Sequence, residues 1–287
     1  MNKSCYLCNS KDIKLIHRGT RDNSNINVME CCSCKLVFLS SFDHIKDIIY
    51  EESEMHIDKK KIDINKYREK TRNDDLRRVS MLSKEIMDKH ILDFGCGNGG
   101  FIKYASEVAK SKKIKGVELE NKERYYLINE GFEIKKYISE YDERFDLITM
   151  FHVLEHLVDP ICILKQLANY LNDDGEIIIE VPNADEALIK LYNLKEFKDF
   201  TYWSFHAFLY NIENIDKLIY KSGFRIKWKK QIQRYSLANH LYWLAHKKPN
   251  GHNNWIFLDD DEINKLYKQK LEKHNLCDTI MISIVKK

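Results

Sequence analysis

A glycine-dense turn between a short apolar strand and a helix constrains the fold more than any other part of this sequence. The stretch covers residues 90–101 and reads HILDFGCGNGGF. Glycine adopts positive φ freely, and its backbone can lie directly against a ligand because no Cβ intervenes. A strand, a glycine loop and a helix in this order form the nucleotide-binding crevice of doubly wound α/β domains. The sequence therefore predicts an α/β domain with a ligand site at this turn.

Two kinds of ligand fit the spacing of the glycines. Gly95, Gly97 and Gly100 match the G-x-G-x-x-G fingerprint of dinucleotide-binding proteins, and Glu118 follows at about the distance of the acid that binds ribose. The D-x-G-x-G-x-G run that begins at Asp93 resembles motif I of class I S-adenosylmethionine (SAM) methyltransferases. A pyrophosphate needs bare N–H groups at a helix N-terminus, whereas a carboxylate suits the sulfonium, ammonium and ribose of SAM. We therefore favour SAM and keep a dinucleotide-dependent oxidoreductase as the alternative.

Length and charge limit the class of protein. The 287 residues suffice for one large domain or a core with appendages, since a domain commonly holds about 100–200 residues. A net charge of +3 argues against a dedicated nucleic-acid binder, which would carry a strong basic excess. No apolar run approaches the ~20 residues of a membrane span, and the N-terminus has no apolar signal core. We expect a cytoplasmic protein without a nucleic-acid partner and without a membrane span.

Two cysteine pairs lie in the first forty residues. Cys5 and Cys8 form one C-x-x-C pair, and Cys31 and Cys34 form the second. Two such pairs can close four thiolates around a tetrahedral zinc ion, and a closed four-cysteine site is structural because it has no open position. Cys32 could replace Cys31, but we prefer Cys31 because both pairs then have the same spacing. We expect a small zinc-ribbon unit here.

Strands and helices alternate regularly after the glycine loop. Leu76, Val79, Leu82 and Ile86 recur at helical spacing and predict an amphipathic helix that leads into the core. Strands separated by helices of ten or so residues indicate a parallel, doubly wound sheet. The further strands are expected at 114–119, 132–135, 145–151, 176–181 and 279–285, and the helices at 121–130, 160–171 and 212–221.

Several later segments extend the resemblance to methyltransferases. Residues 151–160 (FHVLEHLVDP) resemble the segment after strand four in a large bacterial group, and residues 179–183 resemble the end of its strand five. Residues 206–224 resemble its late segment before strand six, and residues 31–38 resemble the second zinc knuckle of sugar C-methyltransferases. The resemblance covers residues 1–230. It implies a doubly wound, mostly parallel, seven-stranded Rossmann-like methyltransferase sheet with a small N-terminal zinc-ribbon unit.

The resemblance also implies where SAM binds. Glu118 would accept hydrogen bonds from both ribose hydroxyls, a role that suits an ionised carboxylate. Tyr67 would close over the cofactor from the preceding helix, and adenine would lie near Tyr137 and Ile138. The expected cofactor-binding residues are Tyr67, Asp93, Gly95, Cys96, Gly97, Gly99, Glu118, Leu119, Tyr137, Ile138, Phe151 and His152.

Methyl transfer requires alignment of the acceptor and removal of its proton. A neutral histidine is the natural base for a hydroxyl, and the candidates are His206, His152 and His156. We favour His206, because its segment should cap the acceptor site, and expect the rate to rise with pH through an imidazole pKa near 6.5. Sugar C-methyltransferases place a glutamate before this histidine, whereas this chain has Phe205. The difference leaves room for O-methylation.

These observations predict an enzyme, a SAM-dependent methyltransferase with a structural zinc ion. Its expected acceptor is a sugar or sugar-nucleotide hydroxyl in bacterial surface glycan biosynthesis, and polar and aromatic residues after position 230 suit a sugar. Alternatives are an O-methyltransferase of a quinone or polyketide, the oxidoreductase, and an adaptor with an inactive fold. The expected parts are a zinc ribbon (1–40), a helical lid or linker (41–88), a SAM-binding core (89–230) and a C-terminal acceptor-site segment with the last strand (231–287).

Overall fold

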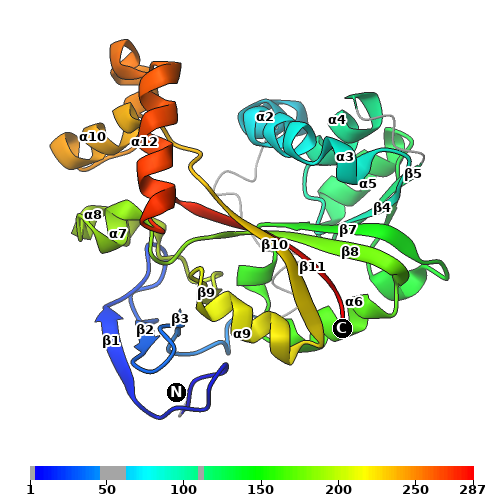
Figure 1. Cartoon of the computed structure of the whole chain (residues 1–287), viewed down its shortest axis with the longest axis horizontal. Coiled ribbons are helices and arrows are strands. Elements are labelled where there is room, and N and C mark those ends of the chain that lie inside the picture. Colours follow the sequence, from blue (N-terminus) through cyan, green and yellow to red (C-terminus); the bar gives the residue numbers. More distant parts are fainter. Residues whose placement is uncertain (1–3, 46–62, 109–112) are drawn as a thin grey trace.

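The computed structural model describes residues 4–45, 63–108 and 113–287, and a seven-stranded sheet lies at the centre of these residues (Figure 1). Its strands, in chain order, are β4 (His90–Phe94), β5 (Lys113–Val117), β6 (Glu133–Lys135), β7 (Phe145–Phe151), β8 (Leu171–Pro182), β10 (Phe224–Ile232) and β11 (Thr279–Lys286). The spatial order is β10-β11-β8-β7-β4-β5-β6. Strands β6 to β8 pair in parallel through β5, β4 and β7, while β11 pairs antiparallel with β8 and β10. The predicted mostly parallel, doubly wound sheet is confirmed.

Helices cover both faces of this sheet (Figure 1). The helices, in chain order, are α2 (Ile64–Met81), α3 (Ser83–Ile86), α4 (Gly100–Val108), α5 (Asn121–Asn129), α6 (Pro160–Ala168), α7 (Ala187–Lys190), α8 (Lys195–Thr201), α9 (Asn214–Lys221), α10 (Leu237–His246), α11 (Gly251–Asn254) and α12 (Asp261–Lys273). Short 3-10 helices are η2 (Ile138–Glu140), η3 (Leu154–His156) and η4 (Ile256–Leu258). The apolar stripe predicted before the core divides between α2 and α3, and part of the predicted lid, residues 46–62, lies outside the described residues.

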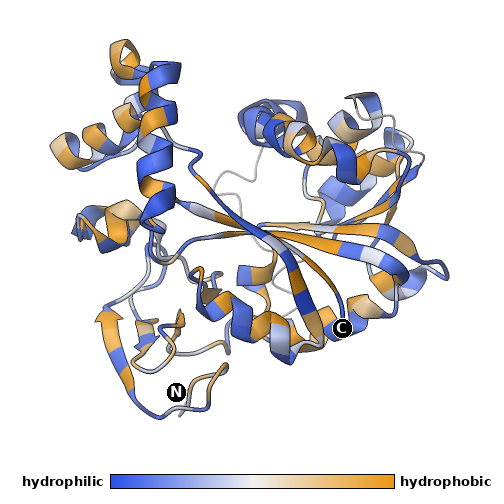
Figure 2. Ribbon diagram, in the orientation of Figure 1, coloured by the Kyte–Doolittle hydropathy of each residue, from blue (hydrophilic) through white to orange (hydrophobic). Residues whose placement is uncertain are grey.

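Alternate residues of a strand point to opposite faces of the sheet. Ile91, Leu147 and Ile178 pack with apolar residues of α2, α3 and α4, whereas Leu92 and Ile148 pack on the other face with α6 and α9. The central strands are accordingly apolar on both faces, as Figure 2 shows. Such strands are typical of parallel sheets covered by helices on both sides. Burial of both faces fixes the carboxyl ends of β4, β5, β7 and β8 along one edge.

A second, antiparallel sheet joins the N-terminus to the rest of the chain. It contains β1 (Ile13–His17), β2 (Val28–Cys31), β3 (Val37–Leu39) and β9 (Phe208–Leu209) in that order. Strand β9 lies within residues 206–224, and its two residues pair with Phe38 and Val37 of β3. Leu36 and Phe38 also share one buried apolar cluster with core residues such as Phe145. The N-terminal unit is therefore packed against the core.

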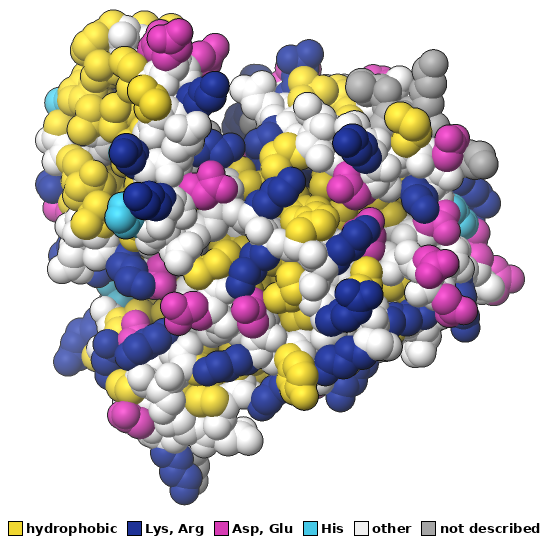
Figure 3. All heavy atoms as spheres, in the orientation of Figure 1, with side chains coloured by type: hydrophobic (Ala, Val, Ile, Leu, Met, Phe, Trp, Pro, Cys, Tyr) yellow, Lys and Arg dark blue, Asp and Glu magenta, His cyan; other side chains and the backbone are white. Residues whose placement is uncertain are grey.

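Helices α10, α11 and α12 fill the chain between β10 and β11, where no motif predicted a structure. The Ser236 hydroxyl accepts from the Asn239 N–H at 3.3 Å and starts α10, and the Asp260 carboxylate accepts from the Ile263 N–H at 3.0 Å and starts α12. Such side chains satisfy N–H groups that the first turn leaves without partners. Figure 3 shows hydrophobic side chains gathered on this part of the surface, where Phe257 is 76% exposed.

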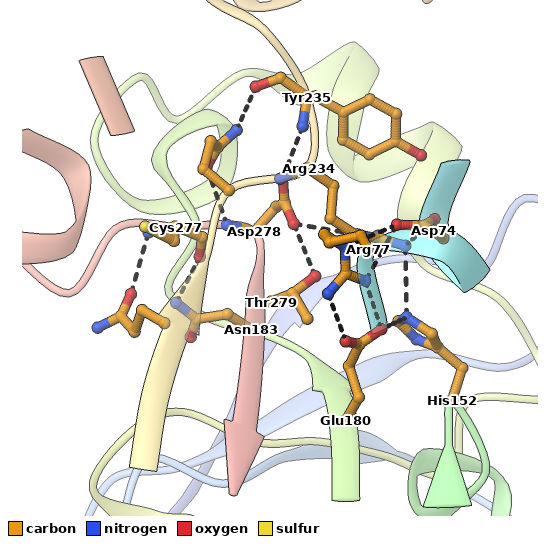
Figure 4. A network of polar contacts seen from close by, with 12 residues as sticks. Asp74, Arg77, His152, Glu180, Asn183, Arg234, Tyr235, Cys277, Asp278 and Thr279 are labelled. Atoms are coloured by element: carbon orange, nitrogen blue, oxygen red, sulfur yellow. Dashed lines mark hydrogen bonds and ion pairs between the residues drawn. The ribbon is translucent and has the colours of Figure 1, made fainter. Parts of the chain in front are cut away.

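Helix α2 is fastened to the end of β8 by buried ion pairs. The Arg77 guanidinium donates to both Glu180 oxygens at 3.0 Å, and the Arg78 guanidinium donates to Glu180 at 2.7 Å. Figure 4 shows the Glu180 carboxylate between Arg77 and His152. Burial alone would raise the pKa of Glu180, but the positive charge of Arg78 and the hydrogen bond from His152 outweigh it and hold the pKa well below its usual value. The carboxylate is therefore ionised in the interior, which requires both arginines.

Replacement of Glu180 by glutamine should lower the free energy of unfolding by about 3–5 kcal/mol, because both arginines then lose their buried counter-charge. Urea denaturation of the full chain measures the change. Lys195→Gln is the control, since its ion pair with Asp199 at 2.6 Å is exposed and its loss should leave the denaturation midpoint unchanged. Equal stability of the Glu180→Gln variant and the wild type would contradict the assigned role of these ion pairs.

Candidate active site

A cavity of about 1120 Å³ opens at the carboxyl ends of the parallel strands. This edge of an open α/β sheet is where ligands bind. Ligand pockets commonly measure about 300–1,000 Å³, so the volume suffices for a cofactor and an acceptor together. The cavity extends from the glycine loop after β4 to aromatic residues of α8 and α10. All the residues predicted to bind the cofactor line it except Gly99.

The glycines of the loop have different tasks. Gly97 has φ +52°, and a Cβ built on it would meet nothing within 4 Å, so its backbone faces open space in the cavity. A Cβ on Gly95 would lie 2.6 Å from Val153, and one on Gly99 would lie 2.2 Å from Leu127 of α5. Gly99 thus permits helix packing rather than contact with a ligand. Gly97 is therefore the position at which the backbone of the loop is accessible to a ligand in the cavity.

Two carboxylates lie on either side of the accessible backbone at Gly97. Glu118, just after β5, accepts from the Gly97 N–H at 2.7 Å and the Glu120 N–H at 2.8 Å. Asp93 of β4 accepts from the Thr149 hydroxyl at 2.7 Å. Burial raises the pKa of each carboxyl to about 7, since the hydrogen bonds compensate only part of the desolvation. Both groups gain a stable charge when a cationic, hydroxyl-bearing ligand lies beside them.

Helix α2 closes over the loop. Arg68 donates to the Asn98 carbonyl at 2.7 Å and to the Glu130 carboxylate at 2.8 Å. A Cβ on Gly100 would lie 2.2 Å from an Asp75 oxygen, so the helix touches the loop backbone. Tyr67 lines the cavity from this helix, and burial, with the charges of nearby acids, raises its pKa to about 12. Tyr67, the predicted lid residue, therefore lies in the cavity wall near the glycine loop, and its contact with a cofactor stays a prediction.

His152 lies just after β7, at the centre of a network of charges (Figure 4). Its Nδ1 is 3.2 Å from Glu155, and its Nε2 is 3.3 Å from both Glu180 and an Arg234 nitrogen. Its φ of +55° is unusual for a residue with a Cβ, and such strain concentrates at functional sites. Burial lowers the pKa of His152, but the hydrogen bonds to Glu155 and Glu180 outweigh it and raise the pKa overall.

His156 and His206 lie side by side at the far end, with ring centroids 5.0 Å apart. The His156 Nδ1 donates to the Phe205 carbonyl at 2.8 Å. Burial lowers the pKa of both rings, and for His206 burial and the neighbouring His156 lower it to about 3. This direction is opposite to what a pH profile with a pKa near 6.5 would require of His206, and the profile itself stays a prediction. Glu155 supplies the acid next to these rings that the sequence analysis found missing at Phe205.

An aromatic wall completes the far end of the cavity. The ring of Trp243 packs edge-on to Phe197 at 5.1 Å and lies 5.3 Å from Phe200, while Trp203 lies 5.4 Å from His206. Trp243 belongs to the polar and aromatic stretch that the sequence analysis linked to a sugar. The other three aromatic residues and Glu155 were not identified from the sequence. The signal for the aromatic residues is their clustering at 197–205, which matches no recognised motif, and Glu155 lies inside the segment 151–160 that resembled methyltransferases.

The four cysteines predicted as zinc ligands converge at the N-terminal unit. The sulfurs of Cys5 and Cys34 are 3.5 Å apart, as are those of Cys8 and Cys31. All four sulfurs lie within 4.8 Å of one another, and the cluster contains Cys31 rather than Cys32. A tetrahedral zinc ion with Zn–S bonds of about 2.3 Å needs sulfurs about 3.8 Å apart. The arrangement therefore fits a four-thiolate site.

With the geometry established, residues 65–227 match a family model described as a methyltransferase domain. The chain belongs to this family. The match covers the glycine loop, both carboxylates and all three candidate histidines. The predicted enzyme class, a SAM-dependent methyltransferase, is thereby confirmed at the level of the family, and the dinucleotide alternative is not supported.

Curated relatives resemble only part of the chain. A ubiquinone biosynthesis O-methyltransferase of Aeromonas salmonicida is 25% identical over 109 residues, which is 34% of this chain and 45% of the relative. A tRNA U34 carboxymethyltransferase of Nautilia profundicola is 35% identical over 105 residues, or 33% of this chain and 35% of the relative. The matched part spans less than half of each relative, so neither name transfers to this chain.

Two solved structures share the fold. A SAM-dependent methyltransferase from Archaeoglobus fulgidus has a TM-score of 0.51 at 22% identity, and the superposition covers 77% of this chain and 94% of that protein. The plantazolicin methyltransferase BamL, solved with a desmethylPZN analogue and SAH, has a TM-score of 0.53 at 15% identity. Here the superposition covers 84% of this chain and 94% of BamL. At these identities the likeness extends to the fold alone.

Among the described residues, none of the helices has the length and apolarity of a membrane span.

Replacement of Glu118 by alanine should weaken SAM binding by about 1.5–3 kcal/mol, the worth of hydrogen bonds to a charged group. Because its carboxyl has a pKa of about 7 without ligand, the protonated fraction grows as pH falls from 8 to 6, and wild-type affinity should fall with it. Calorimetric titration with SAM at both pH values measures this. Glu107→Ala, exposed on α4, is the control. Unchanged affinity in Glu118→Ala would show that the ribose lies elsewhere.

Proposed function

We propose that this chain transfers the methyl group of SAM to a hydroxyl of a small polar acceptor, a sugar or sugar nucleotide in surface glycan biosynthesis. One observation carries the proposal: a single cavity joins Asp93 and Glu118 to the pair His156 and His206. Carboxylates suit the cationic cofactor at one end, and imidazoles suit a hydroxyl at the other. The strand ends between them hold the two reactants in line, which supplies much of the rate acceleration.

The chemistry is an in-line displacement. The acceptor oxygen forms a bond to the methyl carbon, the S–CH₃ bond breaks, and its electron pair stays on sulfur to give S-adenosylhomocysteine. The hydroxyl proton leaves toward the imidazoles. Burial lowers the pKa of His206 and His156, so both rings are neutral near pH 7 and can accept a hydrogen bond from the hydroxyl. The two ring nitrogens of His152 already contact Glu155, Glu180 and Arg234.

The walls of the acceptor end support a ring-shaped acceptor. Aromatic side chains such as Trp203 and Trp243 line this end and suit the C–H groups of a sugar ring, and the polar side chain of Asn239 lines the cavity with them. A phenol or quinone precursor is the second candidate, since it fits the same wall and the Aeromonas salmonicida relative is named for ubiquinone biosynthesis. On the face of the molecule drawn in Figure 3, acidic and basic side chains are intermixed. A tRNA-binding surface would instead present a stripe of basic side chains.

Each of the four parts of the chain has its own role in this proposal. We propose that residues 1–40 hold a structural zinc ion, 41–88 cover the cofactor, 89–230 bind SAM and 231–287 complete the acceptor end. The cysteine distances support the zinc site, and Arg68 and Tyr67 support the covering role of α2. The acceptor role of the last part is supported by Trp243 and Arg234, which line the cavity.

A mass-spectrometric screen for a methyl gain across free sugars, nucleotide sugars and phenols tests the acceptor. A sugar hydroxyl should be methylated, and His206→Ala should lose about 10²–10⁴-fold in turnover, the usual worth of proton removal, with unchanged SAM affinity. His252→Ala, a half-buried histidine of the same cavity, should retain activity. Methylation of phenols alone would favour the second candidate.

Replacement of Cys8 by serine should remove one zinc equivalent per chain, since three thiolates bind the ion far less tightly than four. Elemental analysis of freshly purified protein measures the loss, and SAM binding should remain. Cys32→Ser is the matched control because Cys32 lies beside the cluster without belonging to it. Zinc retained in Cys8→Ser and lost in Cys32→Ser would reassign the fourth ligand.

A further inference from the structure

Glu155, His156 and His206 form a compact group at the acceptor end of the cavity. One ligand atom of each lies within 4.8 Å of those of the other two. The first two belong to η3 after β7, and His206 comes from the segment before β9, about fifty positions further along the chain. The group mixes one carboxylate with two imidazoles, and all three residues line the cavity.

The outer atoms of this group are held in place, whereas two inner atoms lack protein partners. Glu155 Oε1 bonds with His152 at 3.2 Å, and the His156 Nδ1 donates to a backbone carbonyl at 2.8 Å. Glu155 Oε2 and His206 Nδ1 are buried and have no hydrogen-bond partner. Buried polar atoms are almost always satisfied, and an exception calls for a bound water or ion. Metal-binding carboxylates and histidines are held from behind in this manner.

The donor types of the three groups suit a metal ion. Carboxylate oxygens and imidazole nitrogens are ligands of zinc in proteins, and they bind it in their deprotonated forms.

We propose that Glu155, His156 and His206 bind one divalent transition-metal ion of the zinc type, separate from the cysteine site. Two imidazoles and a carboxylate are a donor set that zinc accepts with an open fourth position. Small side-chain rotations would bring the ligand atoms from within 4.8 Å to the roughly 3.0–3.5 Å spacing around such an ion. Magnesium fits less well, because it prefers oxygen ligands.

The role of the ion rests on the proposed function. Because the three residues line the cavity, an ion held by them would be accessible to an acceptor hydroxyl, and binding would lower the pKa of that hydroxyl. In the metal-bound enzyme the hydroxyl proton passes to water, the oxygen electron pair forms the bond to the methyl carbon, and the S–CH₃ pair stays on sulfur. The two imidazoles then act as ligands of the ion, and the bound ion lowers the pKa of the hydroxyl in place of a protein base.

Metal counting on the full chain tests the site. Chelator-stripped protein is reloaded with Zn²⁺, dialysed and measured by elemental analysis, and a parallel titration uses Co²⁺. Wild type should hold two equivalents, and Cys8→Ser, Glu155→Gln and His206→Ala one each. The Co²⁺–thiolate charge-transfer band should persist in the last two variants and weaken in Cys8→Ser. His252→Ala should keep both equivalents.

SAM calorimetry on the same samples shows that each variant is folded and separates the two proposals. Two metal equivalents in wild type, one in Glu155→Gln with unchanged SAM affinity, would support the second site. A single equivalent in wild type, or two equivalents retained by both Glu155→Gln and His206→Ala, would overturn it and leave the proposed methyl transfer intact. Two equivalents without SAM binding would support the metal site and overturn the proposed function.

Discussion

The buried charge of Glu180 is the constraint on which the active-site edge depends. An ionised carboxylate at the end of β8 must be compensated, and the compensation comes from Arg77 and Arg78 of α2. The covering helix is thereby tied to the sheet at the point where the cavity opens. The same carboxylate lies 3.3 Å from His152. Lid, strand end and the first histidine after β7 therefore behave as one unit.

Local patterns predicted most of the sheet and little of the C-terminal helices. The apolar run at 176–181 predicted β8, and the helix expected at 160–171 is α6, since both signals act within a few residues. Helices α10 to α12 owe their stability to tertiary packing, and their caps resemble ordinary loop residues. Strand β9 has two residues and exists only because the edge of β3 lies beside it. No local pattern indicates such a pairing.

The two ends of the cavity differ in the same way. Asp93, Gly95 and Gly97 lie in one loop, so their spacing alone indicated a cofactor site. The acceptor end is assembled from segments far apart in the chain, and Glu155 acquires its importance from His206, which follows about fifty positions later. The sequence suggested three histidines but could not show which nitrogens are already bonded. That information depends on the Phe205 carbonyl and on burial.

The pairing of β3 with β9 has a consequence for modular exchange among such enzymes. The paired residue Phe208 follows His206 by two positions, so the hydrogen bonds of the N-terminal sheet set the position of a histidine in the acceptor pocket. A chimera that takes its first forty residues from another methyltransferase would change the edge on which β9 rests. We expect such a chimera to keep the position of His206 only if its first forty residues and its residues 206–209 come from the same parent. Two segments far apart in the chain would then have to be exchanged together.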